Sequence, residues 1–216
     1  MRTANISREE LAQRLERRFG RNEPIFLKEI TEAWSEYSRS RVFRLIRELC
    51  DEGTLMKDIP GVYYFPVDAE YRPGILLLDT MKIVEKRYIK AEGKTFGYYS
   101  GFFLMNQAGF SNQVPNTREI VTIKESASVR TVMVDGFKVI LRRAKIDINE
   151  KNAPVMQLLE IFKRYDRLLE RYQQENLILL TGGRIDKDTM AECAKCFPKR
   201  ALENFKRSGM YDVLVR

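Results

Sequence analysis

The chain has 216 residues, with 38 lysines and arginines, 30 aspartates and glutamates, and no histidine. The lack of histidine excludes Ser-His-Asp and Cys-His nucleophiles, an imidazole general base and histidine-ligated metals. A hydrophobic fraction of 44% is ordinary for a globular protein, and the length predicts one large or two small domains. The formal charge of +8 suits a polyanionic partner, although charge alone identifies none.

The cysteines and the apolar runs indicate where the protein works. Three cysteines are too few for a secreted disulfide scaffold. The first residues have no apolar run typical of a signal peptide. The densest apolar run, Gly74–Leu78, has the length of a core strand rather than of a membrane span. We expect a soluble, cytoplasmic protein with no membrane partner.

Three helices are predicted in the first part of the chain. A capping box begins the first helix at Ser7, and Gly20 ends it. An apolar repeat that ends at Trp34 predicts a short second helix. Ser38 can cap a third helix, which runs to a stop at Gly53.

After Gly53 the apolar pattern changes to a period of two residues. Thr54–Lys57 and Val62–Phe65 are strand-like, and Asp58–Gly61 between them has turn chemistry. Three helices followed by a hairpin predict a winged helix-turn-helix over residues 1–67. In that arrangement the third helix lies in the DNA major groove and the hairpin rests on the phosphate backbone.

The third helix carries its arginines outside its buried stripe. The stripe is formed by Val42, Leu45, Ile46 and Leu49. Arginine is the side chain best suited to fork onto guanine or onto phosphates. The predicted DNA-binding residues are Ser38, Arg39, Ser40, Arg41, Arg44, Arg47 and, in the hairpin, Lys57.

Two other interpretations of this helix remain open. A row of arginines on an amphipathic helix is often only a solvated face, and winged helices also serve as protein-docking modules. Residues 1–67 carry a net charge of only +1, against +5 for residues 68–146 and +2 for residues 147–216. The prediction of DNA binding therefore depends on the local arrangement of arginines.

The rest of the chain predicts a mixed α/β domain over residues 74–216, after a short linker at residues 68–73. The overall fold class is thus α+β. Expected helices cover residues 79–89, with Met81, Val84 and Tyr88 on one side, residues 97–109, and a long stretch from Asn152 to about Gln173 that includes Leu168. Expected strands cover residues 119–124, 130–134 and 138–142, with a hairpin turn at Asp135-Gly136.

Fragments of catalytic and metal-binding motifs occur, each incomplete. Glu92–Thr95 resembles the end of a phosphate-binding loop, but Tyr88 stands where a glycine is needed. Cys193 and Cys196 form a single CxxC pair, and zinc would need two further ligands. We predict that the chain is not an enzyme and has no catalytic, cofactor or metal site. The two cysteines are expected to be half-buried apolar residues.

Basic residues gather in the middle of the chain, on or near the predicted strands. Alternation places Lys138 and Arg142 on one face of a strand. This set is either a solvated sheet face or a surface for DNA or RNA. Its members are Lys124, Arg130, Lys138, Arg142, Arg143 and Lys145.

Two segments resemble a known family. Residues 38–66, with Leu49-Cys-Asp-Glu-Gly53 and Gly61-Val-Tyr, look like the N-terminal winged helix of AbiEi-type antitoxins. Residues 98–115, which end in Gln-Val-Pro, look like a segment of the AbiEi antitoxin domain. Together the resemblance covers about residues 5–170 in organisation. The chain departs from the family at Pro60, which replaces a basic residue, at Ala108, which replaces a histidine, and at Phe110, which replaces a leucine.

The resemblance implies a transcriptional repressor and antitoxin of a type IV toxin–antitoxin system. Its winged helix would bind double-stranded DNA, inverted repeats in its own promoter. Its C-terminal domain would antagonise a nucleotidyltransferase-like toxin without a direct complex. Two alternatives stand beside it: a winged-helix regulator whose second domain senses a ligand or dimerises, and a metal-dependent nucleic-acid-processing enzyme.

Overall fold

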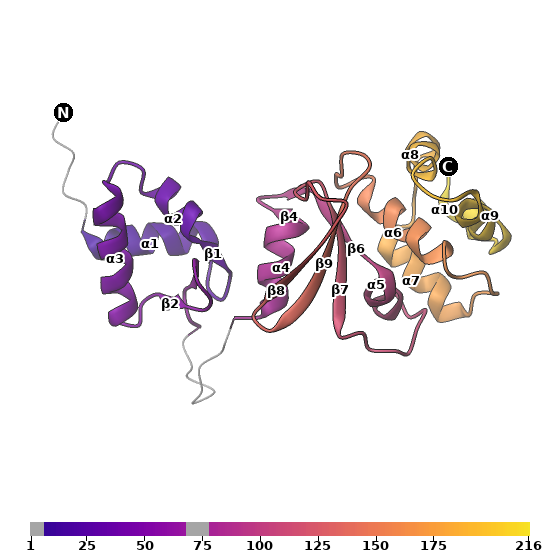
Figure 1. Ribbon diagram of the computed structural model, residues 1–216. Helices are drawn as coiled ribbons and strands as arrows, with labels where there is room; N and C mark the ends of the chain where they lie inside the picture. Colours follow the sequence, from indigo (N-terminus) through magenta and orange to yellow (C-terminus); the bar gives the residue numbers. More distant parts are fainter. Residues whose placement is uncertain (1–6, 68–77) are drawn as a thin grey trace. The chain divides into compact units, whose positions relative to one another are not determined.

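The computed structural model describes residues 7–67 and 78–216 and shows a mixed α and β architecture (Figure 1). The chain divides into two compact units with the boundary between Ile83 and Val84, here named the N-terminal and C-terminal units. The predicted linker at residues 68–73, and residues 74–77 of the apolar run, lie outside the described residues. Among the described residues, no helix combines the length and apolar character needed to cross a membrane.

The first and third helices of the N-terminal unit begin where their capping serines predict. The helices of this unit are α1 (Arg8–Phe19), α2 (Leu27–Ala33) and α3 (Arg39–Asp51). The Ser7 hydroxyl accepts a hydrogen bond from the Glu10 N–H at 3.2 Å, and Ser38 accepts one from the Arg41 N–H at 3.4 Å. Gly20 ends α1 with a φ of +82°, a left-handed conformation that glycine adopts at little cost.

The sheet of this unit has three short strands instead of the predicted two. They are β1 (Ile25–Phe26), β2 (Met56–Lys57) and β3 (Val62–Tyr64), in the order β1-β3-β2. The expected alternation is wrong for residues 62–65, all of which are buried. Because β3 is the central strand, it has a neighbour on each edge, and residues of both its faces are covered.

The three helices enclose one hydrophobic core together with the sheet. Trp34 and Leu15 are among its largest fully buried side chains. All four residues of the predicted stripe on α3 are buried, which confirms the orientation of that helix: Val42, Leu45, Ile46 and Leu49.

The C-terminal unit is built on a four-stranded sheet. Its strands are β6 (Gly97–Ser100), β7 (Thr117–Thr122), β8 (Val129–Val134) and β9 (Phe137–Arg143), in the order β6-β7-β9-β8. The predicted hairpin is confirmed, because β8 and β9 pair antiparallel across Asp135-Gly136, both with positive φ. A small hairpin of β4 (Lys90–Ala91) and β5 (Lys94–Thr95) precedes the sheet.

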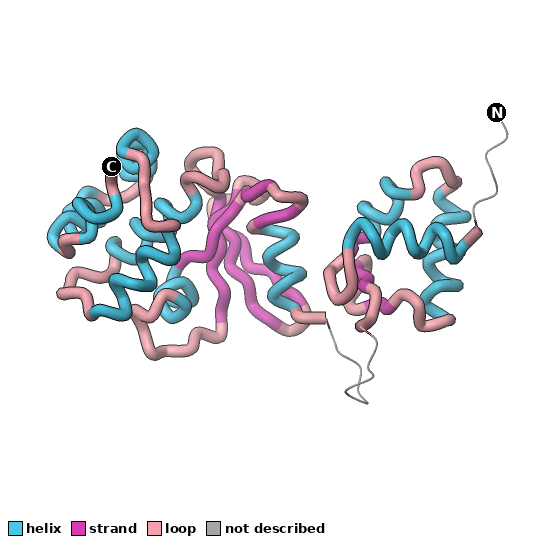
Figure 2. Tube along the Cα trace, turned by 180° about the vertical axis from the view of Figure 1, so that it is seen from behind, coloured by secondary structure: helices cyan, strands magenta, loops and turns pink. Residues whose placement is uncertain are grey.

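Helices cover both faces of this sheet (Figures 1 and 2). On one face lies α4 (Thr80–Tyr88), whose Glu85 accepts a hydrogen bond from the Tyr99 hydroxyl at 3.0 Å. On the other face α6 packs against β6. The remaining helices are α5 (Gly101–Gln107), α6 (Ala153–Phe162), α7 (Arg171–Thr181), α8 (Lys187–Ala194), α9 (Lys199–Arg207) and α10 (Met210–Leu214).

Three helix predictions are corrected in this unit. On α4 the buried residues are Thr80, Ile83 and Val84; of the expected set only Val84 is buried, because Met81 and Tyr88 are half-buried. Residues 97–100 of the expected helix at 97–109 form β6. Gly97 permits this strand, since a Cβ there would overlap the carbonyl oxygens of Tyr88 and Val121.

The expected long helix at residues 152–173 is divided into α6 and α7. After Phe162 the chain turns polar, and Leu168 is 88% exposed. The Gln173 side chain accepts hydrogen bonds from the Tyr165 hydroxyl and from the Glu170 N–H, both at 3.1 Å. These contacts fix a new helix start at Glu170, although neither proline nor glycine marks the break.

Candidate functional site

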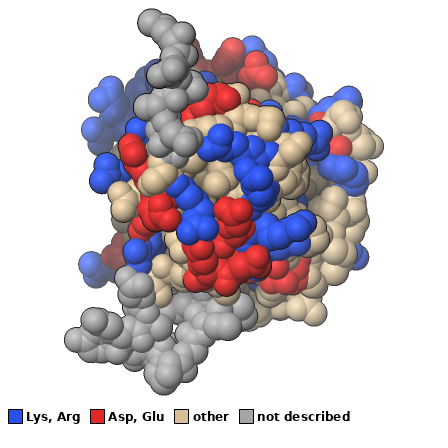
Figure 3. All heavy atoms as spheres, turned by 90° about the vertical axis from the view of Figure 1, so that its left-hand side faces the viewer, with Lys and Arg blue, Asp and Glu red and all other residues tan. Residues whose placement is uncertain are grey.

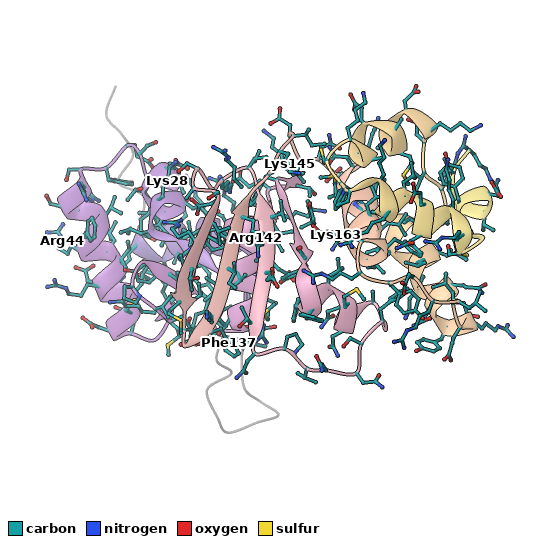
Figure 4. All side chains as sticks on the ribbon, turned by 45° about the vertical axis from the view of Figure 1, so that its right-hand side comes forward. Lys28, Arg44, Phe137, Arg142, Lys145 and Lys163 are labelled. Carbon is teal, nitrogen blue, oxygen red and sulfur yellow. The ribbon has the colours of Figure 1, made fainter. Side chains whose placement is uncertain are left out.

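The outer face of α3 carries most of the predicted site. Arg39, Ser40, Arg44 and Arg47 are exposed; Ser40, Arg44 and Arg47 lie on the side of the helix opposite the core stripe, and Arg39 lies at its N-terminal edge. The side chain of Arg44 is 69% exposed, and Figure 4 shows it projecting from the outside of the N-terminal unit. These side chains are available to a ligand because the fold of α3 does not use them.

Arg41 and Ser38 make local contacts that fix the start of this helix. The Arg41 guanidinium lies over the Tyr37 ring, 4.4 Å from its centroid. Such a cation–π contact orients the guanidinium and leaves its edge N–H groups available. Ser38 is exposed and uses its hydroxyl oxygen as the N-cap. Both residues therefore belong to the N-terminal end of α3, where the helix dipole favours anions.

Acidic side chains lie among the arginines of this face and reduce its net positive charge. Glu48 lies 3.9 Å from Arg44 and 3.7 Å from Arg8 of α1, and Glu52 lies 2.7 Å from Arg8. On the side of the unit that presents α3, acidic and basic groups are interspersed (Figure 3). The site is thus a set of positioned arginines rather than a uniformly basic surface.

A groove of about 550 Å³ runs between α2 and the first turns of α3. It combines apolar and basic side chains, among them Leu27, Lys28, Thr31, Tyr37, Arg39 and Phe43. Lys28 has 85% of its side chain accessible, and Glu32 lies 3.6 Å away. Lys28 and Phe43 are not among the residues predicted from the sequence. Phe43 carried a signal, since it is an aromatic residue outside the apolar stripe of its own helix.

Lys57 lies on the other element of the predicted site. It is exposed on β2, where it pairs with Tyr63 of β3. Burial is the main cause of the raised pKa of the Cys50 thiol in α3, Asp51 adds to it, and the nearby Lys57 ammonium opposes it. The β2–β3 hairpin therefore places a cation beside the last turn of α3.

The basic residues of the C-terminal unit are largely engaged within the unit. Arg142 projects from the sheet (Figure 4) and contacts Glu119 at 3.2 Å, while Arg130 contacts Glu125 at 2.7 Å. Lys145 donates a hydrogen bond to the carbonyl of Cys196 at 2.8 Å. The register confirms that Lys138 and Arg142 share one face of β9. This set does not converge on one site.

The two cysteines of the CxxC pair behave as apolar residues of the core. Cys193 on α8 is buried, and Cys196 is half-buried. Burial raises the pKa of the Cys193 thiol to about 11, with Cys196 and Glu192 as smaller causes. In residues 7–67 and 78–216, no three cysteine or acidic side chains are grouped as a metal ion would require.

No family model matches the chain, and no curated protein matches it.

Proposed function

We propose that the N-terminal unit is a winged helix-turn-helix domain that binds double-stranded DNA and represses transcription from its own promoter. The observation that carries the proposal is the outer face of α3, where Arg39, Arg44 and Arg47 are exposed and take no part in the hydrophobic core. The order of elements agrees with it, since α2 and α3 are followed by the β2–β3 hairpin.

The dimensions of α3 suit the major groove. Its 13 residues make a helix about 20 Å long, and a groove about 12 Å wide admits one helix. Arg44 and Arg47 would reach base edges from the middle of the helix. Ser38, Ser40, Arg39 and Arg41 at its N-terminal end would hold phosphates, where backbone N–H groups also point.

The hairpin and α2 would hold the flanking backbone. Lys57 on β2 is the cation of the wing, because Pro60 occupies the position where the family it resembles has a basic residue. Lys28 at the start of α2 lines the groove beside the first turns of α3, and its neighbour Leu27 donates a backbone hydrogen bond to the Gly61 carbonyl of the hairpin. Phosphate contacts of this kind set the register of a protein on DNA but carry no sequence information.

A gel shift with the DNA upstream of the gene tests the repressor proposal. We expect a complex that survives an excess of unrelated competitor DNA. Equal affinity for a scrambled duplex of the same length and composition would remove the operator from the proposal.

We propose for the C-terminal unit the antitoxin role that the resemblance to AbiEi-type proteins implies. It would act in the cytoplasm as a binding protein without catalytic activity, antagonising a nucleotidyltransferase-like toxin without a direct complex. The support is the order of the α5 segment, the hairpin and α6 after the N-terminal unit, together with the sequence Gln113-Val-Pro115.

Co-expression tests this second half separately. An adjacent gene for a nucleotidyltransferase, expressed from an inducible promoter, should arrest growth, and co-expression of the chain should restore it. The Arg44→Ala variant is the matched control, since it should lose repression and keep rescue. Growth arrest that persists in the presence of well-folded chain would contradict the antitoxin role.

A further inference from the structure

Phe43 is an exposed aromatic residue on the outer face of α3. Its exposed fraction is 40%, whereas every residue of the core stripe on the same helix is buried. It lies one turn after Arg39 and one turn before Arg47, so it sits among the arginines of the site. The fold of α3 already has its complete apolar face without Phe43.

The surroundings of Phe43 hold its ring in place and leave part of it open. The ring lines the groove between α2 and α3 together with Leu27 and Lys28. The Arg39 guanidinium lies 5.6 Å from the ring centroid. A half-open aromatic ring flanked by cations suits a ligand that combines negative charge with an apolar group.

Thymine in duplex DNA offers that combination. In the major groove its edge presents one carbonyl oxygen and the 5-methyl group, which is the apolar group of that groove. A phenyl ring cannot accept or donate an ordinary hydrogen bond, so it can read only the methyl group. The neighbouring arginines can hold the phosphates on either side of the base.

We propose that Phe43 reads the 5-methyl group of a thymine while Arg39, held over its ring, contacts the adjacent phosphate or base. This inference rests on the proposed DNA binding and adds the base that one position of α3 selects. A 5-methylcytosine carries the same methyl group, and the experiment below separates the two sources.

The test uses the full chain and a duplex selected by it from a random-sequence library. Each thymine of the selected duplex is replaced in turn by uracil, which lacks only the methyl group, and binding is measured by fluorescence anisotropy at fixed salt. At one position in each recognised site, the replacement of thymine by uracil should weaken binding about fourfold, which is the contribution of one buried methyl group. The chain should bind weakly to a duplex with cytosine at that position. A duplex with 5-methylcytosine there should recover part of the lost affinity if the methyl group alone is read.

The Phe43→Ala variant should bind the thymine and uracil duplexes equally. Phe43→Leu, which keeps an apolar group, should retain part of the discrimination and guards against a folding defect in the alanine variant. Arg44→Ala should bind more weakly but keep the thymine-to-uracil ratio.

The outcomes separate the two proposals. If the wild-type chain enriches no sequence, the proposed DNA-binding function fails. If it enriches a duplex but no uracil substitution matters, or if Phe43→Ala keeps the thymine-to-uracil ratio, then the role of Phe43 is overturned while DNA binding stands.

Discussion

Glu48 lies one turn after Arg44 on α3, with its Oε1 atom 3.9 Å from the Arg44 Nε atom. The same carboxylate lies 3.7 Å from Arg8 of α1. Glu48 therefore draws two cations toward itself on the helix face proposed to meet DNA. In the proposed complex it would face phosphates of like charge and would restrain binding, while its contact with Arg8 links α3 to α1.

Replacing this carboxylate should strengthen DNA binding. In Glu48→Gln, Arg44 is released and one repulsive charge is removed, and we expect about two- to fivefold tighter binding at low salt. The gain should shrink as salt is raised, because exposed charges are screened. The control is Glu175→Gln on α7, which removes a similar exposed i,i+4 partner from Arg171. Unchanged or weaker binding by Glu48→Gln would place DNA away from this face.

Lys28 gives a prediction of a different form. If it contacts a phosphate, Lys28→Ala should weaken binding to specific and scrambled duplexes alike and reduce the slope of log affinity against log salt by about 1. Titrations at several salt concentrations measure that slope. A loss confined to one sequence would assign Lys28 to base recognition instead.

The core of the N-terminal unit can be followed through its own fluorescence. Trp34 is buried there and is the single tryptophan of the chain, so its emission reports the unfolding of this unit. Leu49→Ala should lower the free energy of unfolding by about 2–5 kcal/mol through transfer and cavity terms. The control Leu168→Ala, at a position 88% exposed between α6 and α7, should leave that transition unchanged. Equal midpoints for Leu49→Ala and the wild type in urea would contradict the core assigned to α3.

The stability of the C-terminal unit should fall in alkaline solution. The pKa of the Cys193 thiol is raised by burial to about 11, above the value near 9 of an exposed thiol. A raised folded-state pKa gives stability that is complete below the unfolded-state value and is lost as pH rises through the folded-state value. Thermal unfolding between pH 8 and 11 should therefore show a decline that is shallower in Cys193→Ala. Identical pH profiles would mean that this thiol ionises equally in both states.

The elements that could be predicted from sequence have local causes. Ser7 and Ser38 cap their helices through hydrogen bonds within three residues, and the repeat of α3 alone fixes which arginines are exposed. Strand β1 could not be found, because two residues form a strand only once β3 lies beside them. The break after α6 depends on Tyr165 meeting Gln173, eight residues further along the chain.

The candidate site likewise contains residues that follow from local sequence and residues that depend on tertiary packing. The arginine face follows from periodicity, whereas the groove exists only because the packing of α2 against α3 brings Lys28 and Phe43 to one surface. No sequence spacing encodes that crossing.

The outer face of α3 is proposed to recognise a DNA sequence. The most direct test is the ratio of affinities for the upstream duplex and for its scrambled counterpart, measured at one salt concentration for the wild type and for Arg44→Ala. We predict a large ratio for the wild type and a loss of about 1–3 kcal/mol on the upstream duplex alone for the variant. A wild-type ratio of one, or a ratio that Arg44→Ala leaves intact, would contradict the claim.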